Sequence, residues 1–246
     1  MKEQSDARLG KMFAVDVRRM LTQKTFYIMI ACSFVLPILI IVMTAMAGEG
    51  EMFTSVWQAI GSADGAMSMD LTGMCNINMV YFLAAVFACL FTADDFRSGA
   101  CKNIFAVRAK KTDYVFSKIA VSFITGALML LFFFAGSMLA GRIAGLIFAM
   151  EGFAAWNLLL CMISKVLLMA IFAAIYVLMG VIAKRHSWMS ILLSFMVGMF
   201  MFMVIPMMTP LDAGLINVVM CLAGGALFTL ALGKVSQIVL EHTDIL

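Results

Sequence analysis

Few residues of this 246-residue chain have the types and spacing that enzymatic catalysis requires. Its two histidines, His186 and His242, fall in a predicted turn and in the C-terminal tail, so neither is placed to activate Ser137 inside a membrane bundle. The six cysteines form no Cys-x-x-Cys pair and no His-x-x-x-His pattern occurs, which argues against a zinc site. The sequence therefore predicts no catalytic residue and no metal site.

A nucleotide-binding motif is also missing. The Gly233-Lys234 pair has Phe228 where a phosphate-binding loop needs glycine, and Val235 where it needs Ser or Thr. The longest polar connections have about 25 residues, fewer than the ~40 that a soluble domain needs without cross-links. We therefore expect this chain to bind no cofactor itself, and any ATP and Mg²⁺ to be bound by a separate chain.

Three polar residues at the ends of apolar segments are candidate pathway residues: Asn76, Asn78 and Lys165. For the asparagines, hydrogen bonding to a neighbouring helix is favoured over lining a pathway. For Lys165, the segment 166–183 provides about 27 Å of helix before Lys184, so both lysines can extend to opposite interfaces. This snorkelling is the favoured interpretation, and it makes the preceding stretch 153–163 a separate outer interfacial helix.

The elements that must carry these residues are membrane helices. Hydrophobic residues make up 64% of the chain and charged residues only 13%, too few to cover a water-soluble core of this size. A hydrocarbon core of ~30 Å needs about 20 apolar residues in a helix. We predict an all-α, polytopic membrane protein forming one transmembrane domain, 1–246, with six transmembrane helices at about 26–47, 72–92, 118–140, 164–183, 189–209 and 214–233.

The orientation follows from the basic residues. With both termini cytoplasmic, 15 of the 17 Lys and Arg lie inside, and only Arg142 and Lys165 lie outside. The first external loop, 48–71, has acidic but no basic residues. A net charge of +3 is too small to suggest a nucleic acid as a partner.

The segment 9–21 is predicted to form an N-terminal amphipathic interfacial helix. It either anchors to anionic headgroups or acts as an elbow that packs against the bundle and a cytoplasmic partner. Outside, Phe53, Val56, Trp57 and Ile60 have the spacing of a short interfacial helix with Trp57 at the level of the headgroups. The expected apolar face of the N-terminal helix is Leu9, Met12, Phe13, Val17, Met20 and Leu21, and its expected polar face is Lys11, Asp16, Arg18, Arg19 and Gln23.

Two further patterns leave alternatives open. Ser137, Gly141 and Gly145 form a small-xxx-small ridge that allows close helix approach, within the chain or across a dimer. The fifth predicted span is rich in methionine, which is typical of plain lipid-facing or core positions and also of cavities for varied apolar cargo.

The loop 93–118 combines apolar and aromatic residues with six basic ones. That composition favours a docking surface over a simple connector, although its apolar residues would also suit a loop that dips into the membrane. We expect Gly99 to end the preceding helix, and a short helix at about 100–107 to present Ile104 and Phe105 to a partner. Basic residues surround these two: Lys102, Arg108, Lys110 and Lys111.

This loop resembles a stretch found in the membrane subunits of type 2 ATP-binding-cassette (ABC) exporters. Those proteins often have an acidic-Phe-x-x-Gly-x-x-Lys-Asn-Ile stretch, a basic turn, and Tyr-x-x-Ser-Lys leading into the third span. The turn differs here, since Ala109-Lys110-Lys111 replaces the usual Ser-Arg type. The matching residues are Asp95, Phe96, Gly99, Lys102, Asn103, Ile104, Tyr114, Ser117 and Lys118.

The resemblance, closest to the compact six-span permeases of bacteriocin-immunity, peptide-export and drug-efflux systems, implies a permease subunit in a bacterial plasma membrane. It would form the translocation pathway as a homo- or heterodimer, be driven by a cytoplasmic ABC ATPase subunit, and export a peptide, drug or lipid-like substrate. Its implied ATPase-coupling residues are Asp95, Phe96, Gly99, Lys102, Asn103, Ile104, Phe105, Lys110, Lys111, Tyr114 and Lys118.

The alternative is a secondary transporter or channel without an ATPase partner. Ion-coupled carriers usually have acidic residues inside their spans, whereas all 14 carboxylates of this chain fall outside the predicted ones. A membrane scaffold that transports nothing is a third interpretation.

Overall fold

The computed structural model describes residues 2–46, 55–57, 76–106, 110–148, 150, 154–184, 186–202 and 204–242. Every regular element longer than a single bridge in these ranges is a helix. The elements are α1 (Lys2–Thr22), α2 (Lys24–Met46), η2 (Ile77–Met79), α4 (Val80–Arg97), α5 (Ala100–Ala106), α6 (Lys111–Ala144), α7 (Ala155–Ala183), α8 (Ser187–Phe202), α9 (Val204–Met208) and α10 (Leu215–Glu241).

Five helices of the described chain are long and apolar enough to cross a membrane: α2, η2 with α4, α6, α7 and α10. The fifth predicted span, 189–209, corresponds to α8, which is shorter, followed by α9. The all-helical prediction is therefore confirmed. The expectation of a separate helix at 153–163 is wrong, because α7 runs without a break from Ala155.

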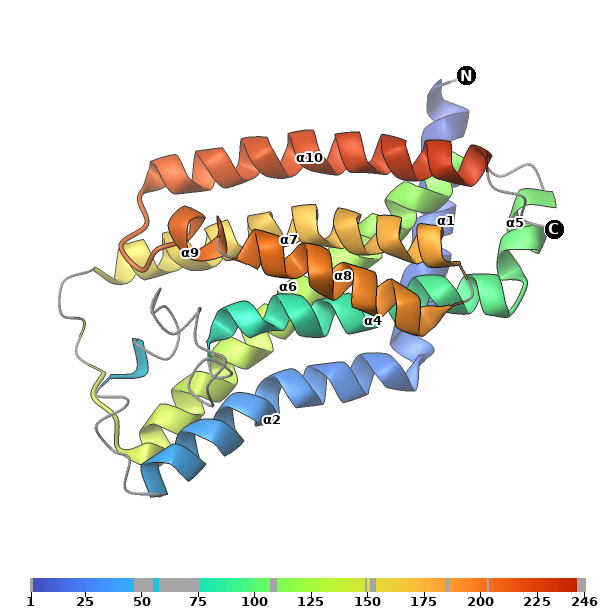
Figure 1. The fold of residues 1–246 in the computed structure, drawn as a ribbon. Coiled ribbons are helices and arrows are strands. Elements are labelled where there is room, and N and C mark those ends of the chain that lie inside the picture. Colours follow the sequence, from blue (N-terminus) through green and yellow to red (C-terminus); the bar gives the residue numbers. More distant parts are fainter. Residues whose placement is uncertain are drawn as a thin grey trace.

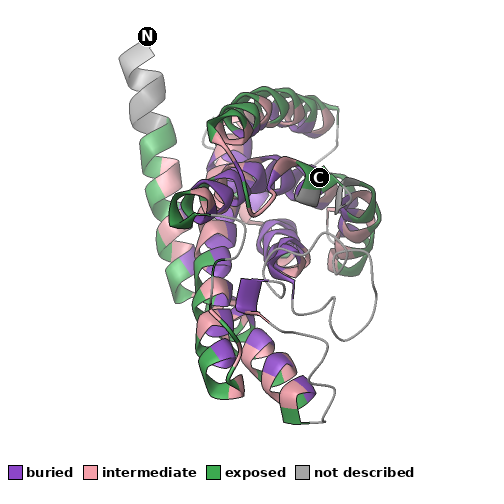
Figure 2. Cartoon of the chain, turned by 90° about the vertical axis from the view of Figure 1, so that its left-hand side faces the viewer, coloured by how far each residue is buried: buried purple, intermediate pink, exposed green. Residues whose placement is uncertain are grey.

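The long helices lie side by side, and α1 and α5 run across one end of the bundle (Figure 1). Helices α4 and α7 occupy the interior: of the most apolar 18-residue stretch of each helix, 67% and 72% are buried. Helices α10 and α2 are peripheral, with 11% and 22% of the corresponding stretch buried. Seen along the bundle, buried residues lie toward the inside and exposed ones on the outer faces (Figure 2). The apolar outer faces are suited to contact lipid or another subunit.

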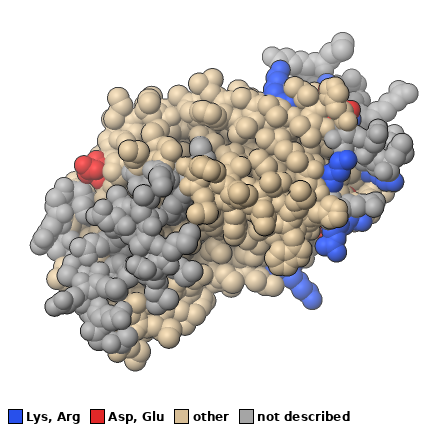
Figure 3. Space-filling view, in the orientation of Figure 1, with Lys and Arg blue, Asp and Glu red and all other residues tan. Residues whose placement is uncertain are grey.

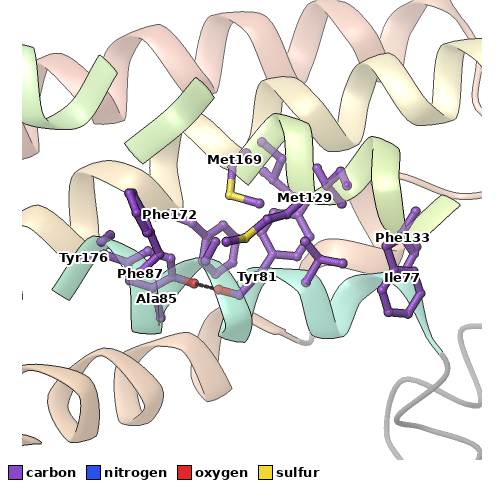
Figure 4. Packing of buried hydrophobic residues seen from close by; sticks show 14 of the residues in the cluster. Ile77, Tyr81, Ala85, Phe87, Met129, Phe133, Met169, Phe172 and Tyr176 are labelled. Atoms are coloured by element: carbon purple, nitrogen blue, oxygen red, sulfur yellow. Dashed lines mark hydrogen bonds between the residues drawn. The ribbon is translucent and has the colours of Figure 1, made fainter. Parts of the chain in front are cut away.

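Aromatic and methionine side chains fill the interior between α4, α6 and α7 (Figure 4). The Tyr81 and Phe172 ring centroids lie 4.6 Å apart, and the Tyr176 hydroxyl donates to the Tyr81 carbonyl oxygen at 2.8 Å (Figure 4). Met129 and Met169 are fully buried here, as core hydrophobes. In α8, Met196 and Met199 are exposed on the outer surface of the bundle, where lipid contact is the simplest role.

The helix α1 packs on the bundle through much of its predicted apolar face, including Phe13, Val17 and Met20. Its predicted polar face is only partly correct. Asp16 is buried, and the Arg19 side chain also turns toward the bundle, where both meet charged groups of other helices. The helix α1 therefore packs against the bundle, which is one part of the elbow interpretation.

Trp57 is buried at the end opposite α1, so its expected position among the lipid headgroups is wrong. Its indole nitrogen donates to the Phe148 carbonyl oxygen at 3.3 Å. Val56 packs so closely on Gly141 that a Cβ on that glycine would lie 2.1 Å from the valine. The glycine thus serves packing within the chain. Phe53 and Ile60 lie outside the described residues.

Candidate functional site

The candidate site is the end of the bundle where α4 turns into α5. The helix α4 ends at Arg97, and the Ser98 amide and hydroxyl both donate to the Asp94 carbonyl oxygen. Gly99 then adopts a left-handed φ of 72°, which a residue with a Cβ rarely takes. The predicted role of Gly99 as the end of this helix is confirmed, and α5 closely matches the short helix expected at 100–107.

A buried ammonium is the centre of the site. The Lys118 Nζ atom lies 2.7 Å from an oxygen of Asp16 in α1 and 2.7 Å from an oxygen of Asp95 in α4. Lys118 and Asp95 are almost completely buried. The ammonium also lies 4.0 Å from the centroid of the Phe91 ring. Two carboxylates and an aromatic face thus replace the water that the ammonium has lost.

A second cation extends this arrangement. The Arg19 guanidinium contacts Asp95 and lies 2.7 Å from Asp94. The Tyr114 hydroxyl donates to Asp95 at 2.9 Å, and the Ser117 hydroxyl donates to Asp16 at 2.5 Å. We name Asp16, Arg19, Asp94, Asp95 and Lys118 the charge network; it connects α1, α4 and α6.

The inner side of helix α5 packs on Tyr114, which bonds to Asp95 of this network. Cys101 is buried and its thiol donates to the Tyr114 hydroxyl at 3.5 Å; burial raises the pKa of Cys101. The Phe105 and Tyr114 rings meet edge to face at 5.5 Å. The outer side of α5 exposes Lys102 and Asn103.

Two of the predicted docking residues pack within the chain. Ile104 and Phe105 are half-buried against helices of the same chain, whereas the sequence placed them in the contact with a partner. Lys111 supports the same packing: its ammonium donates to the Leu240 carbonyl oxygen near the end of α10 at 2.8 Å and lies 6.0 Å from the Phe105 ring.

The predicted coupling residues divide by burial. Asp95, Phe96, Tyr114 and Lys118 are buried inside the chain, and Gly99, Lys102, Asn103, Ile104, Phe105, Lys110 and Lys111 are exposed or half-exposed around α5. Arg108 lies outside the described residues.

Sequence reasoning missed Asp16 and Arg19 as partners of this loop. One signal existed in the sequence, because Asp16 is the only acidic residue of the segment 9–21. A single acid facing a basic loop suggests an internal ion pair.

The three candidate pathway residues come together at the other end of the bundle. Lys165 is only 1% exposed, so the snorkelling interpretation is wrong. Its ammonium donates to Asn78 at 2.8 Å and to the Thr209 hydroxyl oxygen at 2.9 Å, which confirms the expected interhelical bond of Asn78. Asn76 lies beside them, and its side-chain oxygen accepts a hydrogen bond from the Asn78 backbone amide.

The surface charge differs between the end of the bundle with the charge network and the rest of the bundle. On the face drawn in Figure 3, Lys and Arg gather where α1 and α5 lie, and a wide uncharged band covers the long helices. Such a band is the surface that a membrane-spanning bundle presents to lipid.

Together, the long apolar helices, the uncharged band and the charged end define a multi-pass membrane protein. A family model described as "ABC-2 family transporter protein" matches residues 20–201. The chain therefore belongs to the ABC-2 family of transporter proteins, as the loop 93–118 indicated. Neither the curated proteins nor the solved structures include a match.

Proposed function

We propose that this chain is the permease subunit of an ABC exporter whose energy comes from a separate ATPase that docks on α5. The position of α5 carries the proposal. It lies outside the bundle at the basic end, exposes Lys102 and Asn103, and has its inner side packed on Tyr114 beside the charge network. A helix with one free polar face and one fixed apolar face is suited to pass a partner's movement inward.

The contacts behind α5 support a mechanical route. Cys101 and Phe105 both touch Tyr114 of α6, and Tyr114 binds Asp95 of α4. Asp95 shares Lys118 with Asp16 of α1. A displacement of α5 would therefore act on three helices at once, because packed ion pairs and rings do not stretch freely.

Two permease chains, identical or different, would form the pathway between them. The apolar outer faces of α2 and α10 are available for a second subunit or for lipid. The ATPase would bind ATP and Mg²⁺, so this chain would not hydrolyse ATP itself. The transported substrate would be a peptide, a drug or a lipid-like molecule.

The proposed orientation has both termini and α5 in the cytoplasm, α1 at the inner interface, and the molecule in a bacterial plasma membrane. The basic residues around α5 support it, since basic residues are retained on the cytoplasmic side.

Co-purification with an ATPase tests the proposal. We expect the wild-type chain, isolated from its native membrane in mild detergent, to retain a stoichiometric ATPase, and Lys102→Glu to reduce the retained ATPase at least tenfold. Lys234→Glu, the same charge change at an exposed position of α10, is the control and should retain it. A lone wild-type protein indifferent to nucleotide would instead favour the secondary transporter or channel.

A further inference from the structure

The cluster around Lys165 connects three elements at the end of the bundle opposite α5. The lysine belongs to α7, Asn78 to η2, and Thr209 follows the last residue of α9. The ammonium is bound only by neutral oxygens: among the described residues, no carboxylate forms an ion pair with it. The buried Lys165 side chain thus holds the three elements together without a carboxylate partner.

Neighbouring bonds converge on the same place. The Tyr81 hydroxyl of α4 donates to the Lys165 carbonyl oxygen at 2.8 Å. Carbonyl oxygens at the end of α9 accept from Cys161 of α7 at 3.4 Å and from Asn217 of α10 at 3.2 Å. These bonds tie α4 and the end of α9 to α7, and α10 to the end of α9, around Lys165.

The two buried lysines differ in how strongly they are held. Lys118 is bound by two carboxylates, whereas Lys165 is bound by one amide and one hydroxyl oxygen. Only the bonds of Lys118 join opposite charges, and separating buried opposite charges is costly. The end of the bundle at Lys165 is thus held by weaker bonds than the end at Lys118.

We infer that Lys165, Asn78 and Thr209 form the latch of a gate at the end of the bundle away from α5. When the gate opens, α7 separates from η2 and from the end of α9, and the Lys165 ammonium exchanges its two protein acceptors for water. The charge network stays closed in that step. This inference rests on the proposed transport function, since a gate has a purpose only in a pathway.

A natural cysteine can report opening. Cys161 is buried one helical turn before Lys165 and bonds to the Thr209 carbonyl oxygen, so it becomes accessible if the latch releases. In a chain with Cys161 as its only cysteine, we expect Lys165→Met to raise the rate of labelling by a membrane-impermeant thiosulfonate, added from outside, at least tenfold. Lys184→Met, at the other end of α7, should leave the rate unchanged.

A second reporter separates a local opening from unfolding. Cys89 is buried in α4 and contacts the Ser194 hydroxyl oxygen of α8 at 3.1 Å, away from the latch. As the only cysteine, it should stay unlabelled in Lys165→Met. The latch is refuted if Cys161 labelling does not rise, or if Cys89 becomes labelled equally fast.

Cys161 labelling also distinguishes failure of the latch from failure of the proposed function. Labelling of the Lys165→Met variant needs only the permease in vesicles, without an ATPase. With the co-purified ATPase trapped by ATP and vanadate, the wild-type Cys161 should also label faster. Faster labelling in Lys165→Met without an effect of trapping would support the latch and contradict an ATPase-driven gate.

Discussion

Replacing Lys118 by methionine is the sharpest test of the charge network. Methionine keeps much of the side-chain volume but removes the ammonium that lies 2.7 Å from both Asp16 and Asp95. Asp95 retains Arg19 and the Tyr114 hydroxyl, whereas Asp16 retains only the Ser117 hydroxyl among the contacts described above. The loss therefore falls mainly on the bond between α1 and α6.

The expected loss of stability in Lys118→Met follows from the burial of the ion pairs. Removing one partner of a buried ion pair typically costs about 3–5 kcal/mol, because the other charge stays buried without compensation. For a chain of this length, that corresponds to a drop in Tm of about 6–20 °C. Adding Asp16→Asn to Lys118→Met removes the uncompensated charge and should restore about 1–3 kcal/mol.

Thermal unfolding in detergent, followed by size-exclusion chromatography after heating, measures this loss. Lys102→Met is the matched control, since this exposed lysine should change the stability by no more than about 0.5 kcal/mol. Equal Tm values for Lys118→Met and Lys102→Met would refute the reasoning that the network stabilises the fold.

Two further predictions concern helix packing and thiol reactivity. Gly136→Ala should destabilise the protein by about 1–3 kcal/mol, because the added Cβ would lie 2.3 Å from the Phe34 carbonyl oxygen of α2. Gly224 has open space around it, so Gly224→Ala is the control and should be neutral or stabilising in the same unfolding assay. The raised pKa of Cys101 leaves little thiolate at neutral pH, so N-ethylmaleimide should modify Cys101 slowly, and faster only as the pH rises through the raised pKa. A cysteine introduced at the exposed position 102 should react rapidly at pH 7, and equal rates at the two positions would contradict the burial of Cys101.

The sequence alone determined the class of protein, the approximate spans and the loop that carries the candidate site. These properties are local: hydropathy, basic residues and the motif around Gly99 can be read along a single stretch of chain. Helix ends were less accurate, since α6 extends beyond the predicted 118–140 at both ends. Polar residues near a helix end are tolerated when other helices cover them, as Ser117 and Lys118 are.

The tertiary structure alone decided which groups meet. Lys118 and Asp16 are about 100 residues apart in the chain, and neither residue specifies the other. Burial of Lys165 depends on Asn78 and Thr209, which reach it only after η2 and α9 pack on α7. Hydropathy shows whether a side chain suits lipid or water, but its partner is fixed by the packing of distant helices.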